Sequence, residues 1–175
     1  MICALVFATV THSHSRPPAW LDKELAGYLL VDDEKHPTIC VYDKRSGFFL
    51  ERSGECDGAI LWVTLTRDRN IPVREGYSVP NFKVIDGSQN KLTIRPLPSL
   101  STSKGVKIGD SPADVRNRLG KPTYAKRTGS RNQFLSFEYQ WSQGKGDLDD
   151  SYTETYTFKA GRLIEVHFLK ENSAG

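Results

Sequence analysis

The stretch KGVKIGDSPADVRNRLGKPT, residues 104–123, carries the signals for the start of a short helix. Ser111 is a residue type favoured at the N-cap, and Asp114 follows three positions later, as in a capping box. Pro112 then occupies the first helical position, where its missing N–H costs nothing. The pattern predicts a helix that begins at Pro112.

The same stretch marks the end of this helix. Gly120 is typical of the position just beyond a helix C-terminus, and Pro122 prevents continuation. Val115 and Leu119 are spaced to share one face. We expect a helix over residues 112–119 whose apolar face packs on another element, because so short a helix is marginal alone in water.

Strand-like sequence follows the helix and supplies a surface for it. Residues 134–141, 152–158 and 162–169 alternate apolar and polar side chains, as half-buried strands do. A tight turn at residues 159–162 joins the last two, and residues 142–151 resemble an exposed hairpin tip. The expected fold class is α+β, with antiparallel β-meanders and the short capped helix packed on the C-terminal sheet.

The first half of the chain is also rich in strand signals. Residues 38–43 and 47–52 predict a hairpin, and residues 59–68 predict a strand that is covered on both faces. Residues 81–96 predict a second hairpin. Residues 16–35 instead favour a short helix, because their apolar side chains follow helical spacing. Those side chains are Leu21, Leu25, Tyr28 and Leu29.

Composition divides the chain into three parts. Residues 1–15 resemble a signal peptide: an apolar run too short to span a bilayer precedes small residues, with cleavage after Ser15. A buried first strand is the alternative. The small polar segment 99–105 indicates a linker. It separates a β-rich N-terminal subdomain, residues 16–98, from an α+β subdomain, residues 104–170.

The cysteines bear on the compartment. Cys3 lies within the predicted signal peptide, and Cys40 and Cys56 remain as an even pair. In an oxidising compartment these two would form one disulfide. If the protein is not exported, two separate buried thiols are the favoured alternative. No other apolar run has the length of a transmembrane helix, so we expect no transmembrane segment.

The charge is mild overall but unevenly distributed. The net charge is +3, yet residues 87–137 hold ten basic and two acidic residues. Such a block could face an acidic protein, an anionic lipid or a nucleic acid. The alternative is a solvated face whose charges pair with the acidic flanks after folding. The candidate binding residues are Arg116, Arg118, Lys121, Tyr124, Lys126, Arg127 and Arg131.

The C-terminal half, residues 104–169, resembles the SmpA/OmlA family of small bacterial envelope proteins and the similarly built β-lactamase-inhibitor proteins. The resemblance rests on a capped helix followed by strands that end in a phenylalanine, a turn glycine and a leucine. It implies an exported, non-enzymatic module that works by contact with other proteins, in envelope assembly or as an inhibitor. The matching residues are Gly109, Val115, Leu119, Gly120, Pro122, Phe158, Gly161 and Leu163.

Other functions have weaker support in the sequence. A small secreted hydrolase with a site between the two halves would use His36, His167 and the Asp147 loop. An anionic-surface binder would use the basic block of residues 87–137. Nucleic acid is disfavoured as a partner because no binding motif accompanies the charge. We expect no cofactor and no metal site, since the sequence contains none of the usual phosphate- or zinc-binding motifs.

Overall fold

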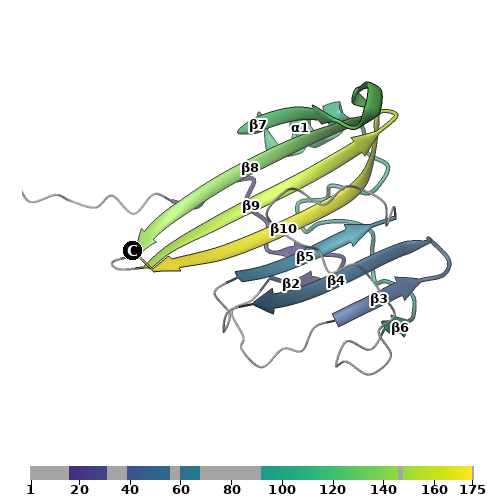
Figure 1. Ribbon diagram of the computed structural model, residues 1–175, viewed down its shortest axis with the longest axis horizontal. Coiled ribbons are helices and arrows are strands. Elements are labelled where there is room, and N and C mark those ends of the chain that lie inside the picture. Colours follow the sequence, from purple (N-terminus) through teal and green to yellow (C-terminus); the bar gives the residue numbers. More distant parts are fainter. Residues whose placement is uncertain (1–15, 31–38, 56–59, 68–91, 146–147, 175) are drawn as a thin grey trace, which may run out of the picture.

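The computed structural model describes residues 16–30, 39–55, 60–67, 92–145 and 148–174 (Figure 1). Its centre is one mixed sheet with the strand order β6-β3-β4-β5-β10-β9-β8-β7. Neighbouring strands are antiparallel, except that β6 runs parallel to β3. The strands are β3 (Ile39–Asp43), β4 (Phe48–Glu55), β5 (Ile60–Thr66), β6 (Leu92–Ile94), β7 (Tyr124–Thr128), β8 (Phe134–Lys145), β9 (Leu148–Lys159) and β10 (Arg162–Ala174).

The expectation of a β-rich fold that contains the short capped helix is confirmed. The helix α1 spans Pro112–Leu119, as its capping signals predict. The Ser111 hydroxyl accepts from the backbone N–H of Asp114 at 3.2 Å, and the Asp114 carboxylate accepts from the backbone N–H of Ser111 at 3.0 Å. At the other end, the N–H of Gly120 donates to the carbonyl of Arg116 at 2.8 Å.

The sheet passes through both halves of the chain. Strand β5 pairs with β10 from Thr66 opposite Glu165 to Ile60 opposite Glu171. The predicted regions 16–98 and 104–170 therefore contribute strands to one sheet. They also share one hydrophobic core, in which a single row of side chains crosses six strands: Val41, Leu50, Leu65, Val166, Tyr156 and Phe137.

Helix α1 and irregular segments cover this face of the sheet (Figure 1). Val115 and Leu119 of α1 are buried in the core, which confirms the predicted apolar face. Leu25 and Val106 are fully buried in the same core. The core thus lies between this face of the sheet and a layer formed by α1 and irregular segments.

The prediction of a helix within residues 16–35 is wrong. Two short strands, β1 (Glu24–Leu25) and β2 (Tyr28–Leu29), form a hairpin there. Ala26 and Gly27 join them with positive φ angles of 53° and 81°, the geometry of a tight two-residue turn. The N–H of Ala26 donates to the carbonyl of Ser101 at 2.9 Å, so pairing with the segment 99–105 replaces helical hydrogen bonds.

Strand β10 departs from simple alternation. A register shift lies between Leu163 and Glu165, where the strand has a bulge. Leu163 consequently faces the core, whereas His167 lies on the opposite face with Glu165 and Leu169. Uninterrupted alternation along residues 162–169 would place His167 on the same face as Leu163, and the bulge separates them. The predicted tip at residues 142–151 is also shorter, because β8 continues to Lys145 and β9 starts at Leu148.

Several predictions lie outside the described residues. These are the signal peptide of residues 1–15, the first strand of the predicted hairpin at 81–96, and one partner of the predicted disulfide, Cys56. Only the backbone of Cys40 is described, in β3. Within the part of the chain that the structure describes, no helix has the length and apolar character needed to cross a membrane.

Candidate functional site

Strand β7 forms one border of the sheet (Figure 1). It pairs with β8 on its inner side, and no strand of the described residues pairs with its outer side. Four of its five residues are exposed, and Tyr124 has 59% of its surface accessible. An edge of this kind presents unpaired backbone N–H and C=O groups to solvent.

One hydrogen bond shows which backbone groups of β7 point outward. The N–H of Gln140 in β8 donates to the Thr123 hydroxyl at 3.1 Å, so Gln140 directs its backbone groups towards the β7 side. Backbone direction alternates along a strand, so Glu138 and Ser136 also point towards β7. Their partners are Tyr124 and Lys126.

The residues that alternate with Tyr124 and Lys126 along β7 therefore direct their backbone groups the opposite way. Ala125 and Arg127 direct their N–H and C=O groups away from β8, towards the outer edge. Ala125 is exposed, with a small side chain. The outer edge of β7 thus consists of two backbone N–H and C=O pairs within a strand that is already held in extended form.

The structure separates the predicted basic residues into two groups. Arg116 lies over the Phe137 ring, 5.3 Å from its centroid, and Arg118 forms an ion pair with Asp110 at 2.9 Å. These two contacts fasten α1 to its surroundings. The other basic residues form no ion pair among the described residues: Lys121, Lys126, Arg127 and Arg131.

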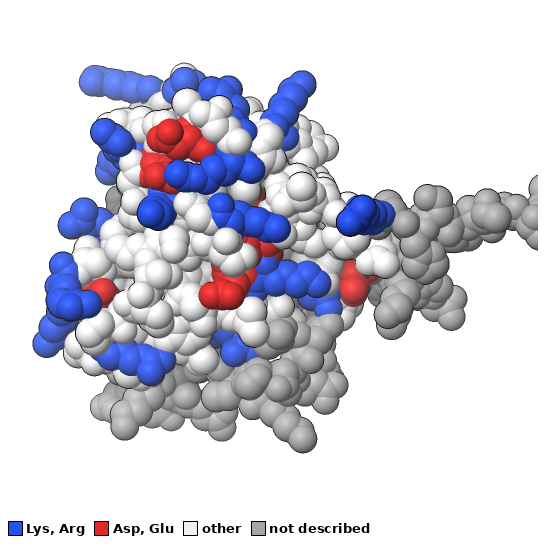
Figure 2. Space-filling view, turned by 180° about the vertical axis from the view of Figure 1, so that it is seen from behind, with Lys and Arg blue, Asp and Glu red and all other residues white. Residues whose placement is uncertain are grey.

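The second group does not form one flat patch. Tyr124 and Lys126 lie on one face of β7, and Arg127 lies on the face of α1. Arg131 lies in the turn Ser130–Asn132 with a φ of 63°. Seen from behind, Lys and Arg side chains gather at the end of the molecule where α1 and β7 lie (Figure 2). We use the name β7 basic edge for the cations Lys121, Lys126, Arg127 and Arg131 together with Tyr124.

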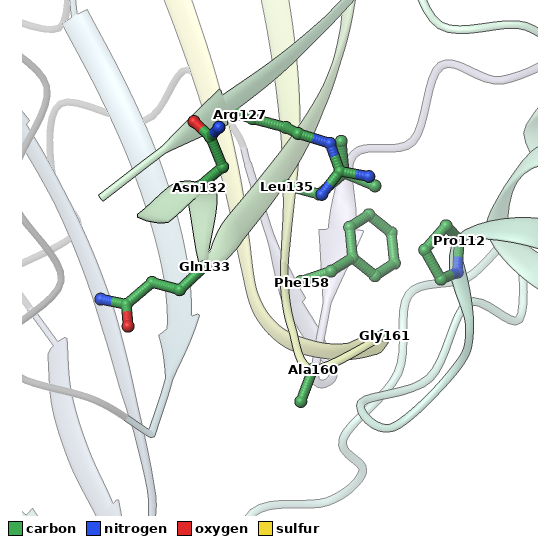
Figure 3. Close-up of a pocket in the computed structure, with 8 residues that line it drawn as sticks. All are labelled: Pro112, Arg127, Asn132, Gln133, Leu135, Phe158, Ala160 and Gly161. Carbon is green, nitrogen blue, oxygen red and sulfur yellow. The ribbon is translucent and has the colours of Figure 1, made fainter. Parts of the chain in front are cut away.

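A shallow pocket lies beside this edge on the α1 face, with a volume of about 320 Å³. Its floor is the cross-strand pair Leu135 and Phe158, and the Arg127 side chain extends over that floor (Figure 3). Pro112, at the start of α1, forms the opposite wall (Figure 3). The pocket thus combines an apolar floor with a cation at its rim.

The hydrolase candidates are not brought together within the described structure. His36 and Asp147 lie outside the described residues. His167 lies on the sheet face opposite α1, where its Nδ1 is 2.7 Å from the Thr64 hydroxyl. Glu51 lies beside Thr64 in the same cross-strand row, and burial raises the pKa of Glu51 to about 7. No described group of three or more His, Cys, Asp or Glu could hold a metal ion.

One buried carboxyl was missed by the sequence analysis. Glu154 is 1% exposed on the core face of β9, between Tyr152 and Tyr156. Its carboxyl accepts from the N–H of Asp22 at 2.5 Å and from the Tyr156 hydroxyl at 2.7 Å. Burial is the main cause that raises the pKa of Glu154 to about 8. The sequence does contain a signal for this burial, because Glu154 shares the alternating face of Tyr152 and Tyr156 in the stretch YTETYTF.

No family model, no curated protein and no solved structure matches this chain. The resemblance to the SmpA/OmlA family thus stays a prediction from the sequence.

Proposed function

We propose that this protein is an exported, non-enzymatic module that binds another protein through the β7 basic edge. The observation that supports this function is the outer side of β7, where extended backbone is exposed together with cations that form no ion pair with any described residue. A pocket with an apolar floor adjoins it. Protein-binding sites commonly combine such backbone and side-chain features.

A capture experiment with a matched control tests this function. The immobilised wild-type protein is compared with Lys126→Glu/Arg127→Glu, which reverses two charges of the β7 basic edge. The control is Lys44→Glu/Arg45→Glu, which makes the same charge change in the exposed turn between β3 and β4. We expect envelope proteins captured by the wild type and the control to be lost with the β7 variant. Identical capture by all three would refute the proposal.

Export is tested on the protein made by its own cell. We expect fractionation to place it in the periplasm or the medium, and mass spectrometry to find a mature chain that starts after Ser15. Thiol labelling of the unreduced, denatured chain should find Cys40 and Cys56 blocked in one disulfide. A full-length chain in the cytoplasm, with Cys40 and Cys56 as free thiols, would refute export.

Binding to an anionic surface is a second candidate function. It is favoured by exposed cations that have no ion-pair partner in the described part of the chain: Lys121, Lys126, Arg127 and Arg131. It predicts binding to acidic vesicles that weakens strongly as salt rises, because surface charges are screened. Vesicle binding that is absent, or that does not depend on salt, would eliminate this function.

A further inference from the structure

The β7 basic edge has two properties that together select a partner. Ala125 and Arg127 offer outward backbone groups for pairing, while Lys126 and Arg127 place one cation on each face of the strand. Lysines on sheet edges repel other strands and so discourage unwanted pairing. An acidic strand would convert this repulsion into attraction, because opposite charges on paired strands stabilise each other.

We propose that β7 binds an extended acidic segment of another protein, which joins the sheet as an added strand. This inference rests on the proposed function and names the partner's chemistry. The backbone of β7 supplies hydrogen bonds that any sequence could use, so side chains must supply selectivity. Charge complementarity with Lys126 and Arg127 favours Asp and Glu in the added strand.

The alternation of side chains defines the register of this segment. A residue opposite Lys126 lies on the face away from α1, where a carboxylate can reach the ammonium group. A residue opposite Arg127 lies on the α1 face, beside the pocket floored by Leu135 and Phe158. Acidic residues at these two positions, with an apolar neighbour on the α1 face, fit the edge best.

Peptide binding tests the inference. The probe is a labelled peptide of about eight residues in which pairs of Glu alternate with pairs of Val, so that two neighbouring Glu residues can lie opposite Lys126 and Arg127, and it is long enough to cover a short strand. Its counterpart replaces each Glu by Lys. Fluorescence anisotropy should show binding of the Glu peptide to the wild type, weaker binding at high salt, and none of the Lys peptide.

A backbone variant separates strand pairing from charge attraction. Ala125→Pro removes one outward N–H, and proline is tolerated where that group faces solvent on an edge strand. We expect it to weaken binding of the Glu peptide by about tenfold, while Ala125→Val, which keeps the N–H, binds as the wild type does. Circular dichroism spectra that match the wild type establish that both variants fold.

Amide hydrogen exchange in the wild type provides an independent readout. In the free protein the amides of Ala125 and Arg127 should exchange quickly, and those of Tyr124 and Lys126 slowly, because only the latter bond to β8. The Glu peptide should slow exchange at Ala125 and Arg127.

Three results would overturn the inference. Unchanged exchange at Ala125 and Arg127 with bound Glu peptide would show that it binds elsewhere. Equal binding by wild type and Ala125→Pro would show that the charges act without strand pairing, and would leave the capture result intact. Association of the free protein with itself through β7 would make a second copy the occupant. Failure of the proposed function can be distinguished from these results. It would appear as identical protein capture by the wild type, the β7 charge-reversal variant and its control.

Discussion

At the scale of single residues, Glu154 shows how a buried carboxyl can hold distant segments together. It accepts from the N–H of Asp22 and from Tyr156, and the Asp22 carboxylate accepts in turn from the N–H of Lys104 at 2.8 Å and the Ser103 hydroxyl at 2.7 Å. Segments from three regions of the chain therefore meet at the two carboxyl groups of Asp22 and Glu154. Its protonation state should influence the stability of the whole fold.

Stability should fall as pH rises towards 8. The pKa of Glu154 is about 8 in the folded protein against 4.5 for an unperturbed glutamate, so the folded state retains a proton that the unfolded state loses. This stability is fully present below about pH 4.5 and is lost progressively as the pH rises to about 8, on the order of 5 kcal/mol in total. Glu51, with a pKa of about 7, acts in the same direction.

Urea denaturation at several pH values measures this dependence. We expect Glu154→Gln, which stays neutral, to remove most of the loss between pH 5 and pH 8. Glu138→Gln, on the half-exposed opposite face, is the control and should keep the wild-type profile. A Glu154→Gln profile as steep as that of the wild type would contradict the assignment.

Leu119 provides a second test at this scale. It is 6% exposed at the end of the buried face of α1, so Leu119→Ala leaves a cavity in the core. We expect a loss of roughly 2–5 kcal/mol in the free energy of unfolding. Asn117→Ala, at an exposed position of the same helix, is the control. A loss below about 0.5 kcal/mol for Leu119→Ala, the level of a surface change, would show that its side chain is not in the core.

At the scale of elements, α1 depends on its caps. The helix has only eight residues, so the capping box and its contacts with the sheet must offset a costly nucleus. The Tyr139 hydroxyl also donates to the carbonyl of Gly120 at 3.0 Å, which links the end of the helix to β8. The local caps and the hydrogen bond from Tyr139 thus both stabilise this short helix.

The N-cap can be tested separately from the packing. Ser111→Ala removes the hydroxyl that accepts from the N–H of Asp114, and should lower the free energy of unfolding by about 1 kcal/mol. Ser111→Asn should retain most of the stability, since asparagine is an equally good N-cap. Thermal unfolding followed by circular dichroism measures both variants. Equal melting temperatures for Ser111→Ala and the wild type would show that the cap contributes nothing.

At the scale of the whole molecule, the pairing of β5 with β10 joins the two halves. Val63 and Leu65 of β5 pack in the same core as Val166 and Phe168 of β10. A fragment of residues 104–170 would expose the β10 side of this core and its edge. Such shared burial is expected to make unfolding cooperative across both halves.

The tryptophans can report on the two halves independently. In one variant only Trp62 of β5 remains, and in another only Trp141 of β8, with the others replaced by Phe. We expect fluorescence and circular dichroism to give the same urea midpoint within each variant. If the fluorescence midpoint of Trp62 or of Trp141 differed from the circular dichroism midpoint of the same variant, the two halves would unfold as independent units.

The sequence by itself determined those features whose signals lie close together in the chain. The caps of α1 stand within ten residues, and the alternation in β8 and β9 is a local period, so both could be predicted. The hairpin of β3 and β4 follows from its turn residues in the same way. The basic residues of the candidate site were also visible, because charge is a property of composition.

Only the tertiary structure decided the features that depend on distant partners. Leu25 lies in a hairpin because Ala26 bonds to Ser101, a contact that no local period encodes. The junction of β5 with β10 and the division of the basic residues between two faces arise from sheet register. Glu154 is buried because Asp22 and Tyr156 satisfy its carboxyl there. In each case a hydrogen bond or a pairing between remote segments outweighs the local preference of the chain.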